Sequence, residues 1–122
     1  MFIIDEVTGN MTIRQGDTYM FTVEGVDDSY DLYYSVYDSN RKILWEIQTK
    51  PINQVASFNI TPAYSTQLSV PTGRKTETYY YGLKRCKDGY EDTLIVGNKE
   101  VGDLNRILVY PLITEGDENG AS

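Results

Sequence analysis

The sequence predicts an all-β protein, an antiparallel β-sandwich of seven to eight short strands with one short helical turn; the alternative is a partly open β-barrel. Short runs of alternating apolar and polar residues recur at intervals of roughly 10–15 residues. Turn-forming dipeptides such as Asp88-Gly89 separate these runs. No segment has the length and periodicity of a helix that could cover a parallel sheet, which argues against an α/β fold.

The clearest element is a β-hairpin over residues 76–97, centred on Asp88-Gly89. This dipeptide tolerates the positive φ angles of a two-residue type I′ turn. A turn at this position predicts four cross-strand pairs: Arg85 with Asp92, Leu83 with Leu94, Tyr81 with Val96, and Cys86 with Glu91. A slip of one residue would destroy both the charge pair and the apolar stripe, so the sequence specifies this register.

The segments before the hairpin alternate in the same way, which indicates strands with one wet side. The expected strands and half-strands cover residues 2–5, 11–13, 18–24, 31–38, 43–48 and 54–60. Four sets of residues are each expected to share one face: Tyr19, Phe21 and Val23; Leu32, Tyr34 and Val36; Ile43, Trp45 and Ile47; and, facing inward, Ala56, Phe58 and Ile60. Pro51 ends the fifth of these segments, because proline cannot donate to a central ladder.

Thr61-Pro62 predicts a helix start, a capping threonine followed by proline in the first turn, and we expect a short helical crossover to Leu68. The last strand is expected over residues 106–113, with Leu108 and Tyr110 on the face opposite Ile107 and Val109. A tryptophan on an early-middle strand, Trp45, and tyrosines that begin a late strand, Tyr79 to Tyr81, favour an immunoglobulin-like sandwich.

Length and composition indicate one domain, which we assign to residues 1–114. Residues 115–122 form an acidic tail without apolar side chains and are expected to be disordered.

The net charge of −7 makes binding to nucleic acid or to an anionic membrane unfavourable. A single cysteine, the absence of an apolar run long enough to span a membrane, and the lack of a signal-peptide pattern predict synthesis in the cytoplasm.

The residue types that usually carry catalysis are scarce. Without histidine there is no Ser-His-Asp or Cys-His arrangement and no usual general base near neutral pH. Cys86 faces a carboxylate in the predicted hairpin, whereas a nucleophilic thiol needs cationic neighbours. Asp27, Asp28 and Asp31 offer oxygen ligands for calcium, but their spacing differs from that of the known calcium loop. We therefore expect no catalytic residue, no cofactor and no metal, and a protein that is not an enzyme.

The unusual feature of the composition is eleven tyrosines against three phenylalanines and one tryptophan. Tyrosine suits positions where the ring is dry and the hydroxyl is wet, as at protein interfaces. Tyr33, Tyr37, Tyr80 and Tyr110 are expected off the core face and are the candidate partner-binding residues. Three roles remain open for them at this point: seating a partner protein, stacking on sugar rings, or covering the sheet.

Five segments together resemble a known group of domains: Gln15-Gly16-Asp17-Thr18, Phe58-Asn59-Ile60-Thr61-Pro62 with Leu68, Tyr79-Tyr80-Tyr81-Gly82-Leu83, Asp88-Gly89, and Thr93-Leu94-Ile95-Val96-Gly97. Their order is similar to that in small immunoglobulin-like domains of phages and prophages of Gram-positive bacteria. One such domain forms the N-terminal part of upper baseplate proteins. The resemblance spans about 80 residues, from Gln15 to Gly97.

The resemblance implies a non-enzymatic structural or adaptor protein of a virion, in the baseplate, the tail or the head decoration. Its partners would be other virion proteins or further copies of itself. It would be made in the bacterial cytoplasm and then reside in the virion. The alternative function is a carbohydrate-binding module that recognises glycans of the host cell surface through an aromatic platform.

Overall fold

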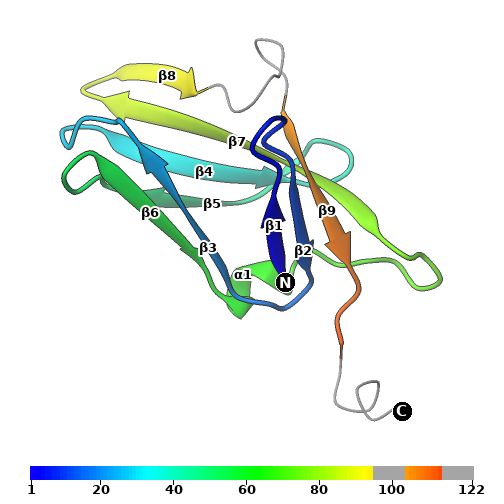
Figure 1. Cartoon of the computed structure of the whole chain (residues 1–122). Coiled ribbons are helices and arrows are strands. Elements are labelled where there is room, and N and C mark those ends of the chain that lie inside the picture. Colours follow the sequence, from blue (N-terminus) through cyan, green and yellow to red (C-terminus); the bar gives the residue numbers. More distant parts are fainter. Residues whose placement is uncertain (95–103, 114–122) are drawn as a thin grey trace.

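Two β-sheets pack face to face, and the computed structural model describes residues 1–94 and 104–113 of the chain (Figure 1). The larger sheet has the strand order β1 (Phe2–Ile4), β2 (Met11–Arg14), β9 (Asn105–Tyr110), β7 (Glu77–Lys87), β4 (Asp31–Tyr37) and β5 (Ile43–Thr49), with β8 (Tyr90–Leu94) paired to β7. The smaller sheet pairs β3 (Tyr19–Glu24) with β6 (Val55–Ile60), and the helical turn α1 (Pro62–Ser65) follows β6. The predicted all-β sandwich is confirmed, and the described strands form no closed barrel.

The described residues form nine strands, one more than the upper end of the predicted range. The N-terminal half-strands account for the difference, because β1 and β2 are separate antiparallel strands. β2 then pairs with β9 in parallel, Met11 opposite Ile107, and this is an exception to the predicted antiparallel arrangement. The pairing joins an early strand to a late one, and no local sequence pattern encodes such a contact.

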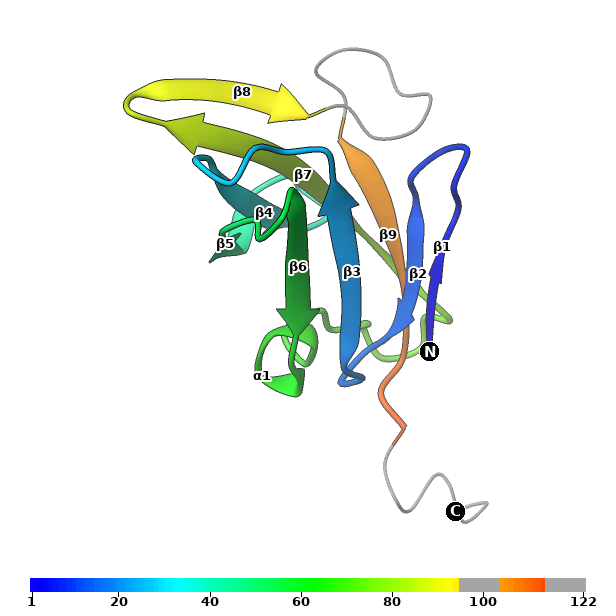
Figure 2. The ribbon, with the colours of Figure 1, turned by 60° about the vertical axis from the view of Figure 1, so that its left-hand side comes forward.

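β7 is the longest strand and organises the larger sheet (Figure 2). One edge of β7 pairs with β4, from Tyr80 to Cys86. The opposite edge pairs with β9 over its first half and with β8 over its second half. The two late strands thus occupy successive halves of the same edge of β7.

The predicted hairpin register is confirmed where the structure describes it. Asp88 and Gly89 have φ angles of 47° and 85°, as a type I′ turn requires. Leu83 lies opposite Leu94, Arg85 opposite Asp92, and Cys86 opposite Glu91. The Arg85 Nε atom donates to Asp92 Oδ2 at 3.0 Å. The remaining predicted partner, Val96, lies outside the described residues.

The core between the sheets is centred on Tyr34, which is fully buried. Its ring contacts aromatic rings from four other strands, with centroid distances of 4.9 Å to Phe21, 5.7 Å to Phe58, 5.8 Å to Trp45 and 5.4 Å to Tyr81. Two of these partners belong to the smaller sheet and two to the larger. Tyr34 therefore joins the two sheets.

Most residues predicted to face inward are in the core. The following are buried: Tyr19, Leu32, Tyr34, Val36, Trp45, Ala56, Phe58, Ile60, Ile107 and Val109. Phe21, Val23 and Ile47 are partly buried and pack against that cluster. The alternation of apolar and polar residues was thus sufficient to predict which side chains of most strands face the core.

Three local predictions are wrong. The last strand, expected over residues 106–113, ends at Tyr110, because Pro111 has no backbone N–H to donate to the ladder. Ile43 is 57% exposed instead of sharing the face of Trp45, because the register shifts between Val36 and Tyr37 and places Ile43 opposite Tyr37. The helix ends at Ser65 rather than extending to Leu68, although Pro62 does begin it. Thr61 occupies the N-cap position, but its side chain makes no capping hydrogen bond.

The domain assignment, residues 1–114, stays a prediction. The proposed disordered tail, residues 115–122, lies outside the described residues.

The neighbouring residues Tyr33 and Tyr34 offer a matched stability test. Replacing Tyr34 with alanine removes ring contacts to both sheets and should lower the free energy of unfolding by about 3–5 kcal/mol. Replacing Tyr33, which points away from the core, should cost no more than about 1 kcal/mol. Urea unfolding followed by circular dichroism measures both values. Equal losses for the two variants would contradict the assignment of faces.

Alkaline unfolding tests the buried phenols. Burial raises the pKa of Tyr19, Tyr34 and Tyr81 above the ordinary value. A phenol with a raised folded-state pKa contributes its full stability below the unfolded-state value of about 10, and loses it as the pH rises toward the folded-state value. We expect the melting temperature to fall steeply above pH of about 10. Tyrosinate absorbance should show these rings ionising only as the protein unfolds, and free ionisation of all tyrosines in the folded state would refute this.

Candidate binding face

The four predicted partner-binding tyrosines all lie on one face of the larger sheet. We call it the outer sheet face, the side turned away from β3 and β6. Tyr33 and Tyr37 alternate with the buried residues of β4, Tyr80 stands between buried Tyr79 and Tyr81 of β7, and Tyr110 follows buried Val109 of β9. Each of the four is partly buried. The sequence prediction that they lie off the core face is correct.

The strand register brings three of these tyrosines into one region. Tyr37 lies opposite Tyr80, and Tyr80 lies opposite Arg106 on the other side, so one row crosses β4, β7 and β9. Two residues further along β9, Leu108 lies between Thr78 of β7 and Thr12 of β2. A third row pairs Tyr110 with Arg14. Tyr33 lies apart from these rows, opposite Lys84.

Arginine side chains cover two of the tyrosine rings. The Arg41 guanidinium carbon lies 4.7 Å from the centre of the Tyr80 ring, and that of Arg14 lies 5.8 Å from the Tyr110 ring. Arg14 also donates from Nη1 to the Pro111 carbonyl oxygen at 2.9 Å. Such cation–π contacts fix the long side chains over the sheet.

We define the arginine–tyrosine patch as the part of the outer sheet face formed by Arg14, Tyr37, Arg41, Tyr80, Arg106, Leu108 and Tyr110. Sequence reasoning missed its arginines. The alternation of β9 carried a signal for Arg106, since it shares a face with Leu108 and Tyr110. Arg41 had no such signal, because it lies in a turn with a φ angle of 64°.

A shallow hollow accompanies the patch. Its volume is about 270 Å³, and it is lined by Asn10, Met11, Thr12, Thr78, Arg106 and Leu108. The two short threonine side chains that flank Leu108 leave this space. An apolar side chain of a partner could therefore pack on Leu108 with a guanidinium at the rim.

Tyr33 borders a different and more polar hollow, of about 350 Å³, near the β7–β8 end of the outer sheet face. Asp31, Glu46, Lys84 and Glu91 also line it. Lys84 Nζ lies 2.9 Å from Glu91 Oε1, and this hydrogen bond raises the Lys84 pKa. The four tyrosines are thus divided between an arginine-rich region and a region of mixed charge.

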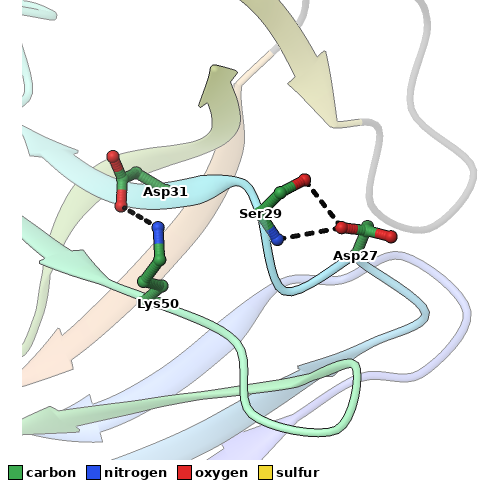
Figure 3. Close-up of polar contacts among 4 residues, drawn as sticks. All are labelled: Asp27, Ser29, Asp31 and Lys50. Atoms are coloured by element: carbon green, nitrogen blue, oxygen red, sulfur yellow. Dashed lines mark hydrogen bonds and ion pairs between the residues drawn. The ribbon is translucent and has the colours of Figure 1, made fainter. Parts of the chain in front are cut away.

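The three aspartates considered for calcium do not share a site. Figure 3 shows two of them, Asp27 and Asp31, each with a different partner. Asp27 accepts hydrogen bonds from the amide and hydroxyl of Ser29, which lower its pKa, whereas Asp31 lies 3.2 Å from Lys50 Nζ. Asp28 accepts instead from the backbone amides of residues 53 and 54. Within residues 1–94 and 104–113, no three His, Cys, Asp or Glu side chains are grouped to hold a metal ion.

Cys86 lies on the outer sheet face with Asp31 and Glu91 as its cross-strand neighbours. The neighbour predicted from the hairpin is thus confirmed, and a second carboxylate joins it from β4. A nucleophilic thiol requires electropositive surroundings instead.

No protein-family model matches the chain, and no curated protein sequence is significantly similar to it. In the part of the chain that the structure describes, no helix is long and apolar enough to cross a membrane.

Proposed function

We propose that the chain is a non-enzymatic module that binds another protein through its outer sheet face. In this proposal it is a structural or adaptor component of a bacteriophage or prophage virion, in the baseplate, tail or head decoration. It is made in the bacterial cytoplasm and then becomes part of the particle, bound to other virion proteins or to its own copies.

The observation that carries the proposal is the arginine–tyrosine patch. Tyrosine and arginine are the residue types enriched at the centres of protein interfaces. The patch combines them with Leu108 and the adjoining hollow on one side of a rigid sheet. Solvated charge alone would not require aromatic rings at these positions.

The virion part of the proposal is supported by the resemblance of the sequence to phage immunoglobulin-like domains. Three of the five segments that carry the resemblance have consistent places in the described part of the fold. Phe58 to Ile60 end β6 directly before α1, Tyr79 to Tyr81 lie in β7, and Asp88-Gly89 forms the hairpin turn. The two-sheet arrangement agrees with an immunoglobulin-like sandwich.

A carbohydrate-binding module is the second candidate, and the hollow beside Tyr33 favours it. Sugar recognition combines an aromatic ring with carboxylate and ammonium groups that bind hydroxyls, and Asp31, Glu46 and Lys84 are beside that ring. Trp45 would not report such binding, because it lies in the core at 8% exposure. Saturation-transfer NMR with host wall glycans, comparing the wild type with Tyr33→Ser, tests this alternative directly.

A double substitution tests the protein-binding proposal. The chain is co-expressed with the products of the genes that flank its own, and complexes are measured by light scattering and calorimetry. Replacing Tyr37 and Tyr80 with serine should weaken the complex by about 2 kcal/mol or more, which is about thirtyfold in Kd. The melting temperature should change little, because neither ring is in the core.

Tyr90→Ser is the matched control, since Tyr90 is 53% exposed at the hairpin tip and contacts Tyr30 rather than the patch. It should bind like the wild type. Flanking genes for capsid, tail or portal proteins would support the virion assignment. A chain that stays monomeric and binds none of these products, or a double variant with unchanged affinity, would refute the proposal.

A further inference from the structure

Three arginines of this acidic protein have no acidic partner among residues 1–94 and 104–113. Among the residues that the structure describes, Arg74 pairs with Glu77 at 3.5 Å and Arg85 with Asp92 at 3.0 Å. No ion pair joins Arg14, Arg41 or Arg106 to a carboxylate of the described ranges. The whole chain has 18 acidic and 11 basic residues, so carboxylates are plentiful elsewhere.

These same three arginines belong to the arginine–tyrosine patch. The three rows of the patch, across β4, β7, β9 and β2, contain no aspartate or glutamate. Three carboxylates of the outer sheet face, Asp31, Glu46 and Glu91, line the polar hollow beside Tyr33. Glu46 also lines a hollow of about 220 Å³ that it shares with Tyr37 at the edge of the patch. The patch is therefore a cationic region with an apolar centre.

We propose that the partner contributes a carboxylate-rich, extended segment of protein to this patch. Its acidic side chains bind Arg14, Arg41 and Arg106, and an apolar side chain packs on Leu108. This inference rests on the proposed function, because it specifies the chemistry of the partner at the same face.

The positions along β9 define the spacing of that segment. Arg106, Leu108 and Tyr110 point to the same side at intervals of two residues, and Arg14 covers the Tyr110 ring. Side chains on one side of an extended strand repeat every ~6.6–6.8 Å. An extended partner with the pattern acidic-x-apolar-x-acidic would place an acid at each end and the apolar residue over Leu108.

The positions of the guanidinium groups over tyrosine rings favour hydrogen bonding to carboxylates. A guanidinium that lies over an aromatic ring keeps its N–H groups in plane and free to donate at its edge. Carboxylates accept two such bonds from one arginine, and these charge-assisted bonds are stronger than neutral ones. The guanidinium carbons of Arg41 and Arg14 lie 4.7 and 5.8 Å from the centres of the Tyr80 and Tyr110 rings, and Arg14 uses Nη1 for its bond to the Pro111 carbonyl. An anionic polysaccharide would also attract arginines, but it has no apolar side chain to fill the hollow beside Leu108.

Selection from a random peptide library tests the inference. An mRNA-displayed library is selected on the immobilised full chain, and the enriched peptides are synthesised for calorimetry. We expect enrichment of acidic-x-apolar-x-acidic sequences whose affinity falls as salt rises. Replacing Arg14, Arg41 and Arg106 with alanine should weaken binding by about a hundredfold, and glutamine versions of the peptides should lose binding similarly.

The control is the Arg74→Ala, Arg85→Ala variant, which removes two arginines outside the patch and should bind the peptides like the wild type. If the triple variant unfolds at a lower temperature, the Arg41→Ala, Arg106→Ala variant replaces it in the binding measurement, because it keeps the Arg14 bond to Pro111. It should still lose most of the affinity.

Each other outcome has a defined meaning. Enriched peptides without acids that still depend on Tyr37 and Tyr80 would overturn this inference and leave the binding face intact. Two results would overturn both proposals: peptides whose affinity is unchanged by both the tyrosine and the arginine variants, or a selection that enriches no peptide. Dextran sulfate that binds the patch more tightly than any peptide would replace the protein partner with an anionic polymer.

Discussion

The contact of the Tyr34 ring with both sheets is the interaction on which the structure depends. Phe21 and Phe58 reach it from the smaller sheet, and Trp45 and Tyr81 from the larger. Because side chains of a strand alternate between its faces, burying Tyr34 turns its neighbours outward. The same alternation continues across β7 and β9. The core and the binding face are therefore two consequences of one constraint.

The tyrosines serve different purposes on the two faces. Inside, each hydroxyl has a partner: Tyr19 and Tyr34 bond each other at 3.0 Å, and Tyr79 and Tyr81 donate to backbone carbonyls. These bonds offset the cost of burying a polar group. Outside, the rings of Tyr80 and Tyr110 lie under the guanidinium groups of Arg41 and Arg14. An abundance of tyrosine in place of phenylalanine suits a thin sandwich in which many aromatic positions reach a polar boundary.

Local chemistry was enough to predict the hairpin, because Asp88-Gly89 fixes the turn and one register satisfies both the charge pair and the apolar pair. It also predicted which side of the sheet Tyr37 and Tyr80 take. It could not predict the parallel pairing of β2 with β9, which joins segments far apart in the chain. The exposure of Ile43 depends on a register shift that the sequence does not mark. The arginines were missed because their significance depends on neighbouring strands and on a turn.

Tyrosine-directed chemical labelling read by mass spectrometry tests this sorting of faces most directly, with the chain free and then saturated with its tightest selected peptide. In the free chain, Tyr37 and Tyr80 should react readily, whereas Tyr34 and Tyr81 should stay protected until the protein unfolds. In the complex, Tyr37 and Tyr80 should become protected while Tyr90 stays reactive. Labelling of Tyr34 in the folded chain, or no change at Tyr37 and Tyr80 on binding, would contradict the account.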